Sequence, residues 1–101
     1  MNVDVSKQDG VLTLKLRGRF EFNSHREFRG AYENHVADET VKSLVIDFSG
    51  VDYLDSSALG MLLLLREKLA AVNKVVALAG ARGPVKQVLD IANFNRLFSI
   101  S

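Results

Sequence analysis

The sequence predicts a mixed α/β domain with its elements in the order β-β-α-β-α-β-α-β. Two alternating apolar segments near the start, two nearly continuous apolar runs later, and helical apolar spacing between them all point to this class. Strands that alternate with helices favour a largely parallel sheet with right-handed crossovers, and an opening hairpin makes the sheet mixed. The length of 101 residues and the absence of a linker-like tract predict a single domain, 1–101.

The first half of the chain predicts a hairpin and a helix. Val3 and Val5 alternate with polar residues, "VLTLKLRG" (11–18) alternates in the same way, and "QDG" between them is a turn signal. The segment "NSHREFRGAYENHVAD" then carries a helical apolar stripe of Phe28, Ala31, Tyr32 and Val36. Ser24 followed by Glu27 predicts a capping box at the start of this helix.

The second half predicts two buried strands, two helices and a short last strand. The run "SLVIDFSG" is typical of a central buried strand, and "KVVALAG" of another. Between them, "DYLDSSALGMLLLLRE" (53–68) predicts the start of a helix that runs to about Val72. Pro84 suits a first helical turn, "RLFSIS" suits a final strand, and the stripe of the helix between them is Val85, Val88, Leu89 and Ala92.

Composition and motifs argue against several classes of function. The net charge is +1 and the basic residues are dispersed, so we expect neither nucleic-acid binding nor attraction to anionic lipid. There is no cysteine, no signal-like N-terminus and no apolar run of membrane-spanning length, which favours a cytoplasmic protein without membrane insertion. We expect no metal site, because His25 and His35, the only histidines, point to different faces of one predicted helix.

No P-loop, G-x-G-x-x-G or G-x-S-x-G motif occurs, which argues against the nucleotide-binding and hydrolase sites that these motifs form. One enzymatic alternative stays open, a small serine hydrolase. It requires His25 or His35 within hydrogen-bond reach of Ser56.

The helix after residue 55 has more apolar residues than one sheet-facing stripe needs. Helical spacing gives one stripe of Leu59, Leu62, Leu63 and Arg66, and a neighbouring stripe of Met61, Leu64, Leu65 and Lys68. If the second stripe is exposed, it is a docking surface for a partner; the competing interpretation is that neighbouring helices cover it. Gly60 costs up to ~1 kcal/mol relative to alanine inside a helix, which indicates tight packing on the sheet or close docking of a partner.

Ser56 and Ser57 lie where this helix begins. Free backbone N–H groups and the helix dipole favour an anion there, so a phosphate on serine is tolerated locally. It would add about −1.5 to −2 charges beside Asp52 and Asp55, at the rim of the apolar stripe. The sequence thus suggests a phosphorylation switch, although serine is also a common helix cap.

The stretch Asp55-Ser56-Ser57-Ala58-Leu59-Gly60 resembles the signature of STAS domains, in particular of bacterial anti-sigma factor antagonists. In those proteins an aspartate precedes two hydroxyl residues, Gly-Leu-Gly and an apolar helix. "LRGRFEFNSHREF" is similar to the strand and loop segment of the family, and "PVKQVLDIANFNRLFSI" to its last helix and strand. The resemblance covers essentially the whole chain.

The resemblance implies a partner-switching regulator without catalysis or cofactor. Ser56 corresponds to the phosphorylated residue, and Asp55 and Ser57 flank it. The implied partners are an anti-sigma factor that is a serine kinase of GHKL type, which binds the unphosphorylated form, and a PP2C-like phosphatase. The partner-binding residues that we expect are Glu21, Ser24, Ala58, Gly60, Met61, Leu64 and Leu65. We expect a monomer or weak dimer; the alternative function is a non-phosphorylated STAS subunit that regulates a transporter ATPase or permease.

Three departures from the family pattern bear on these expectations. Ala58 replaces the usual glycine, which we expect to retune the partner without preventing phosphorylation. Glu21 stands where many members have an aspartate. The C-terminal helix of the family is missing after Ser101, which favours a less covered sheet face or edge.

Overall fold

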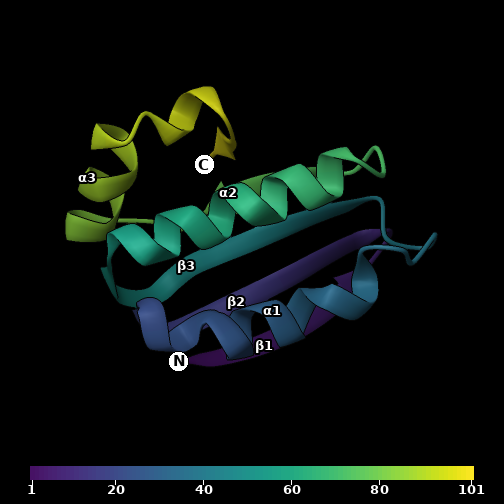
Figure 1. Cartoon of the computed structure of the whole chain (residues 1–101), viewed down its shortest axis with the longest axis horizontal. Coiled ribbons are helices and arrows are strands. Elements are labelled where there is room, and N and C mark those ends of the chain that lie inside the picture. The colour runs from purple at the N-terminus through teal and green to yellow at the C-terminus, as the bar shows by residue number, and fades with distance from the viewer.

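A computed structural model describes residues 1–101 and has the predicted order of elements (Figure 1). The strands are β1 (Asn2–Gln8), β2 (Val11–Phe20), β3 (Ser43–Leu54), β4 (Val75–Ala79) and β5 (Ser99–Ile100). The α-helices are α1 (His25–Tyr32), α2 (Ser56–Ala70) and α3 (Gly83–Ile91). The strands form one sheet in the order β1-β2-β3-β4-β5, with β1 antiparallel to β2 and all other neighbours parallel. The predicted mixed sheet with a central β3 is confirmed.

The opening hairpin turns through Asp9 and Gly10. Their φ angles are 53° and 81°, and two successive positive φ values define the type I′ turn that suits the twist of an antiparallel pair. Glycine adopts such an angle without steric cost, and aspartate is one of the few other residues that tolerates it. The turn sets a continuous register from Gln8 opposite Val11 to Asn2 opposite Arg17.

Helices α1 and α2 lie side by side on one face of the sheet, with α3 beyond the start of α2 (Figure 1). Successive right-handed crossovers in one direction place their helices on the same face. That face of β2 and β3 supplies the core, because inward residues alternate with outward ones such as Lys15. The fully buried members with the largest side chains are Phe20, Phe28, Phe48, Leu12, Leu14, Leu16, Leu44, Ile46, Leu62, Leu65, Leu69 and Leu78.

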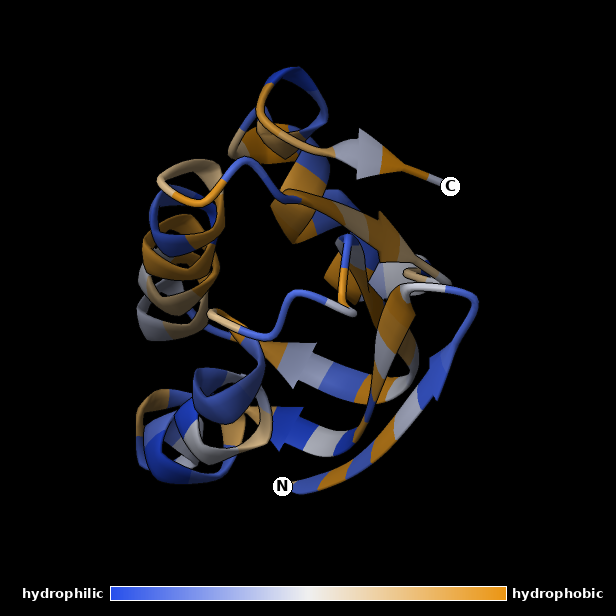
Figure 2. Cartoon of the chain, turned by 90° about the vertical axis from the view of Figure 1, so that its right-hand side faces the viewer, coloured by the Kyte–Doolittle hydropathy of each residue, from blue (hydrophilic) through white to orange (hydrophobic).

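The two central helices differ in composition, as Figure 2 shows: α1 is mostly hydrophilic, whereas α2 is mostly hydrophobic. Helix α1 is also shorter than predicted. It begins at His25 and ends at Tyr32, with 3₁₀ turns at Phe22–Ser24 and Glu33–His35 on either side. Helix α2 begins at Ser56 and ends at Ala70, slightly before the predicted Val72.

The predicted capping box between Ser24 and Glu27 is wrong. The Ser24 hydroxyl donates to the Arg19 carbonyl at 3.0 Å and accepts from the Glu21 N–H at 3.2 Å. It makes no capping bond to α1. A contact with the preceding strand therefore replaces the local contact that the sequence pattern suggested.

Candidate docking and modification site

Asp55 organises the start of α2 with both of its carboxylate oxygens. Its Oδ1 accepts the Ala58 N–H at 2.9 Å and so caps the helix, while its Oδ2 accepts the Phe22 N–H at 3.3 Å. The Asp55 N–H in turn donates to the Phe20 carbonyl at 3.3 Å, at the end of the β2–β3 pairing. One side chain therefore fixes the helix start and the loop after β2 relative to each other.

Ser56 and Ser57 follow this cap and differ in their surroundings. Ser56 is the first residue of α2 and is exposed, and because Asp55 makes the capping bond, the Ser56 hydroxyl has no partner within the chain. Ser57 is half-buried and lines a surface hollow. In the "DSS" stretch, Asp55 therefore caps the helix, and Ser56 carries the free hydroxyl.

The hollow beside Ser57 has a volume of about 490 Å³ and lies between the loop after β2 and α2. Its lining consists of Phe22, His25, Ser57, Gly60, Met61 and Leu64. A smaller hollow adjoins it along α1 and shares His25, Met61 and Leu64. Phe22 is 68% exposed, and its ring lies 6.3 Å from that of His25. The two hollows form a partly apolar surface between α1 and α2 that starts next to the exposed serine.

The structure buries three of the residues expected to bind a partner, and these predictions are corrected. Leu65 and Ala58 are fully buried, and Ser24 is 2% exposed. The buried face of α2 consists of Ala58, Leu62, Leu65 and Leu69. Steps of four, three and four residues follow one face of a helix, so Leu65 faces the sheet and the Ala58 methyl lies in the core. Neither side chain is available for direct contact with a partner.

The outward line of α2 runs from Ser56 through Gly60 to Leu63 and Leu64. Leu63, which the sequence pattern placed on the inward stripe, is 37% exposed, and Leu64 is 47% exposed. Met61 is half-buried at the edge of the hollow. Of the predicted outward stripe, Leu64 is exposed and Met61 is half-buried, whereas Leu65 is buried. Leu63 supplies the exposed apolar surface that was expected from Leu65.

Gly60 is exposed, and a methyl group added at its Cα would meet no atom within 4 Å. This excludes tight packing on the sheet as the reason for glycine at this helix position. Of the two interpretations given for this glycine, only the docking of a partner is left open by the structure.

Glu21 lies at the surface beside the same loop. Its carboxylate pairs with the Arg19 guanidinium at 3.1 Å, and that guanidinium stacks over the Tyr53 ring at 4.1 Å from the ring centre. Sequence reasoning missed Arg19, Phe22 and Tyr53 as surface features of this end. For Phe22 a signal existed, since it is an aromatic residue outside any periodic apolar stripe.

Neither of the two histidines forms a hydrogen bond with Ser56. His25 lines the hollow beside Ser57, and His35 follows α1 with its Nδ1 buried and without a partner. No hydrogen bond joins either imidazole to Ser56 or Ser57. The chain has no cluster of three or more side chains that could ligate a metal. None of its helices combines the length and apolar character needed to cross a lipid bilayer.

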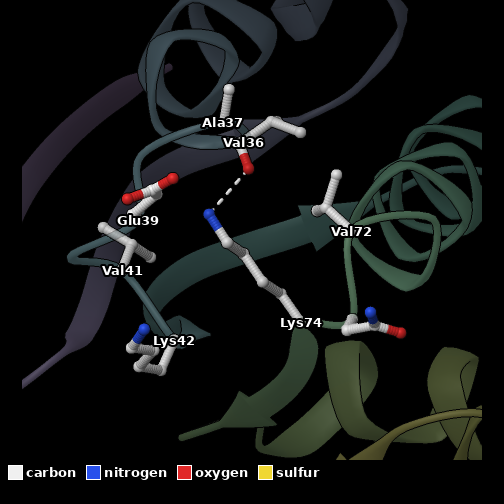
Figure 3. A pocket seen from close by; sticks show the side chains of 8 residues that line it. Val36, Ala37, Glu39, Val41, Lys42, Val72 and Lys74 are labelled. Atoms are coloured by element: carbon white, nitrogen blue, oxygen red, sulfur yellow. Dashed lines mark hydrogen bonds between the residues drawn. The ribbon is translucent and has the colours of Figure 1, made fainter.

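A separate hollow, of about 550 Å³, lies beyond the other end of α2 (Figure 3). Lys74 lines this hollow, and its ammonium points toward Val36, another lining residue, in the segment that follows α1. The ammonium donates to the carbonyls of Val36 at 2.6 Å, Asp38 at 2.7 Å and His35 at 3.2 Å. An ammonium has three donors, so all of them are used within the chain.

Comparison with known proteins assigns the class that this fold and site define. The model of the STAS domain matches residues 2–101, and the chain therefore belongs to the STAS domain family. A STAS-domain containing protein of Pseudomonas aeruginosa is 46% identical over 90 residues, which are 89% of this chain and 87% of that protein.

Among solved structures, an anti-sigma factor antagonist from Mycobacterium paratuberculosis is 27% identical, with a TM-score of 0.85 over 98% of this chain and 83% of that one. The Bacillus cell fate determinant SpoIIAA in its phosphorylated form shares the fold at 15% identity. Its TM-score is 0.76 over 99% of this chain and 91% of that one. The resemblance noted in the sequence is thus confirmed at the level of family and fold.

Proposed function

We propose that the chain is a phosphorylatable partner-switching regulator of the anti-sigma factor antagonist type. In its unphosphorylated form it binds an anti-sigma factor that is a serine kinase of GHKL type, and phosphorylation of Ser56 releases it. The observation that carries this proposal is the exposed, unbonded Ser56 hydroxyl at the head of an exposed apolar line on α2. The family membership and the anti-sigma factor antagonist among its relatives support it.

The local electrostatics favour release after phosphorylation. A phosphate brings about −1.5 to −2 charges and strong hydration to Ser56. Asp55 already occupies the capping position with its own carboxylate, and Asp52 adds another exposed carboxylate nearby in the chain. The phosphate therefore extends toward the partner, and docking on the apolar line requires its desolvation, which is costly for an ion that gains no opposite charge.

The proposal assigns the chemistry to the partners. The kinase supplies the ATP site, a PP2C-like phosphatase removes the phosphate, and this chain contributes the acceptor hydroxyl and the docking surface in the cytoplasm. Glu21, Gly60, Met61 and Leu64 are the expected contacts that the structure leaves accessible, and Leu63 joins them.

The test uses the intact chain with a purified GHKL-type kinase from the same organism and ATP. We expect one phosphate on the wild type and on Ser57→Ala, which is the matched control, and none on Ser56→Ala, as read by mass spectrometry. Transfer to Ser56→Ala at the wild-type rate would falsify the assignment of Ser56.

A binding measurement with the same kinase tests the switch itself. Ser56→Ala should bind like the wild type, whereas Ser56→Asp should bind at least about tenfold more weakly, which is about 1.4 kcal/mol. Equal binding of both variants contradicts the proposal. Co-purification with a membrane ATPase, together with unmodified Ser56 in cells, would instead support the transporter alternative.

A further inference from the structure

The two edges of the sheet are protected to different degrees. At one edge, β5 has two residues, and such a short edge strand offers little for another chain to pair with. At the other edge, β1 has seven residues, an unbroken register with β2, no bulge and no proline. The β1 edge is therefore the one open to strand addition.

Charged side chains usually protect such an edge, but here the two charges on β1 are neutralised within the chain. The Asp4 carboxylate pairs with Arg17 at 3.0 Å. The Lys7 ammonium lies 3.9 Å from the Asp38 carboxylate and donates to the Thr40 hydroxyl at 2.8 Å. Neither charge is left to repel an approaching strand.

The hairpin geometry determines which backbone groups face outward. A two-residue turn closes on a hydrogen-bonded pair, here Gln8 and Val11, and bonded and non-bonded pairs then alternate along an antiparallel ladder. The even-numbered residues of β1 consequently bond to β2. Val3, Val5 and Lys7 direct their N–H and C=O groups away from the sheet.

We infer that a second copy of this chain pairs antiparallel with β1, about a two-fold axis at Val5. Directly opposed residues in a continuous sheet point to the same face, so the two-fold axis must pass through a residue and not between two residues. Among such registers, only the one centred on Val5, the middle residue of β1, pairs all seven residues of the strand. Val3 faces Lys7 of the second copy, Asp4 faces Ser6, and no like charges are opposed. A register centred on Asp4 would oppose two carboxylates and pair fewer residues.

This register uses every free group of the edge. The outward N–H and C=O groups of Val3, Val5 and Lys7 all find partners on the second copy. Val5 is 44% exposed and packs on its own counterpart at the axis. A strand pair of this length buries less than the about 1,200 Å² of a small stable interface, so the dimer is weak and forms as concentration rises.

Sedimentation of the full chain between about 10 µM and 1 mM tests this inference. We expect the wild type to dimerise in this range. Val5→Lys opposes two like charges at the axis and should raise the dimer dissociation constant at least about tenfold. Ser6→Lys adds the same charge one residue away, opposite Asp4 of the second copy, and should dimerise at least as well as the wild type. A monomeric wild type, or equal loss in both variants, overturns the inference.

Single cysteines give a second readout that does not depend on a strong dimer, because the chain has no other cysteine. At the axis, the two Cα atoms of residue 5 lie about 5.5 Å apart, within reach of a disulfide. Val5→Cys should therefore form a covalent dimer under mild oxidation, and Ser6→Cys, offset by two residues from its counterpart, should not. Equal cross-linking of both, or of neither, contradicts the proposed register. Circular dichroism of each variant checks that the monomer is folded.

Discussion

The two ends of α2 differ in how completely their polar groups are used. Just after the C-terminal end, the Lys74 ammonium donates three hydrogen bonds to carbonyls of the segment after α1. At the N-terminal end, Asp55 makes the necessary bonds, and Ser56 is left exposed with its hydroxyl free. Leu63, Leu64 and Phe22 add exposed apolar surface at that same end or beside it.

This contrast separates groups that stabilise the fold from groups that are free to contact another molecule. Groups that are fully bonded within the chain contribute to folding, and their removal leaves partners unsatisfied. Groups that are exposed and unbonded contribute little to folding and are available for a partner or a modifying enzyme. Substitutions at the two ends should therefore separate loss of stability from loss of binding.

The largest effect on stability is expected at Lys74. Lys74→Met keeps the apolar stem but leaves the Val36 carbonyl without its donor, while the His35 and Asp38 carbonyls keep one backbone N–H each. This change should lower the free energy of unfolding by about 1–3 kcal/mol in urea denaturation. The matched control is Lys42→Met, because Lys42 lines the same hollow while its ammonium bonds to no group of the chain. If both variants lose the same stability, the carbonyl cluster is not a source of stability.

A somewhat smaller effect is expected at Asp55. Asp55→Ala removes the cap of α2 and the bond to the Phe22 N–H together, at a cost of about 1–2 kcal/mol in the free energy of unfolding. Kinase binding should also weaken, because the loop and the helix start lose their common anchor. Asp52→Ala removes a neighbouring exposed carboxylate and should change stability by less than about 0.5 kcal/mol. Similar losses in both would show that charge, and not capping, is what matters.

Gly60→Ala should raise the stability of the fold and weaken the binding of the kinase. The open space around Gly60 admits the methyl, so helix propensity should raise the free energy of unfolding by up to about 1 kcal/mol, while kinase binding weakens. Gly30→Ala in α1 is the matched control, since its added methyl also meets no atom within 4 Å. It should gain stability with binding unchanged. Wild-type affinity in Gly60→Ala would remove this glycine from the docking surface.

The smallest effect concerns acid stability near the fully bonded end. Two hydrogen bonds from Thr40, through its N–H at 2.9 Å and its hydroxyl at 2.7 Å, lower the pKa of Asp38 below its ordinary value of 3.8. A lowered pKa stabilises the fold above that ordinary value, and the contribution is lost as the pH falls through the folded-state pKa. The stability advantage of the wild type over Asp38→Asn should therefore shrink below about pH 3.8, as measured by urea unfolding at pH 7 and pH 2.5. An advantage that does not change with pH would contradict this assignment.

The fold was predictable from the sequence because its signals are local. Alternation defined β2, apolar runs defined β3 and β4, and the Asp9-Gly10 turn joined the hairpin. The phase of α2 was not predictable to the residue, because Met61 to Leu65 is an unbroken apolar run that fits several rotations. The contact with the sheet selects one rotation, which buries Leu65 and exposes Leu63. Ser24 was misplaced for a similar reason, since its partner is the Arg19 carbonyl and not its own helix.

The two hydrogen bonds that the Asp55 carboxylate accepts also bear on how the chain folds. Phe22 and Asp55 are 33 residues apart, so the bond between them closes a long loop and cannot form from local structure alone. It requires β2 and β3 to be paired along their length, because Asp55 follows β3 directly and Phe22 lies just after β2. We therefore expect this end of α2 to assemble only after the central strands have paired. A chain in which these strands are not yet paired should accordingly lack the surface that we propose for partner binding.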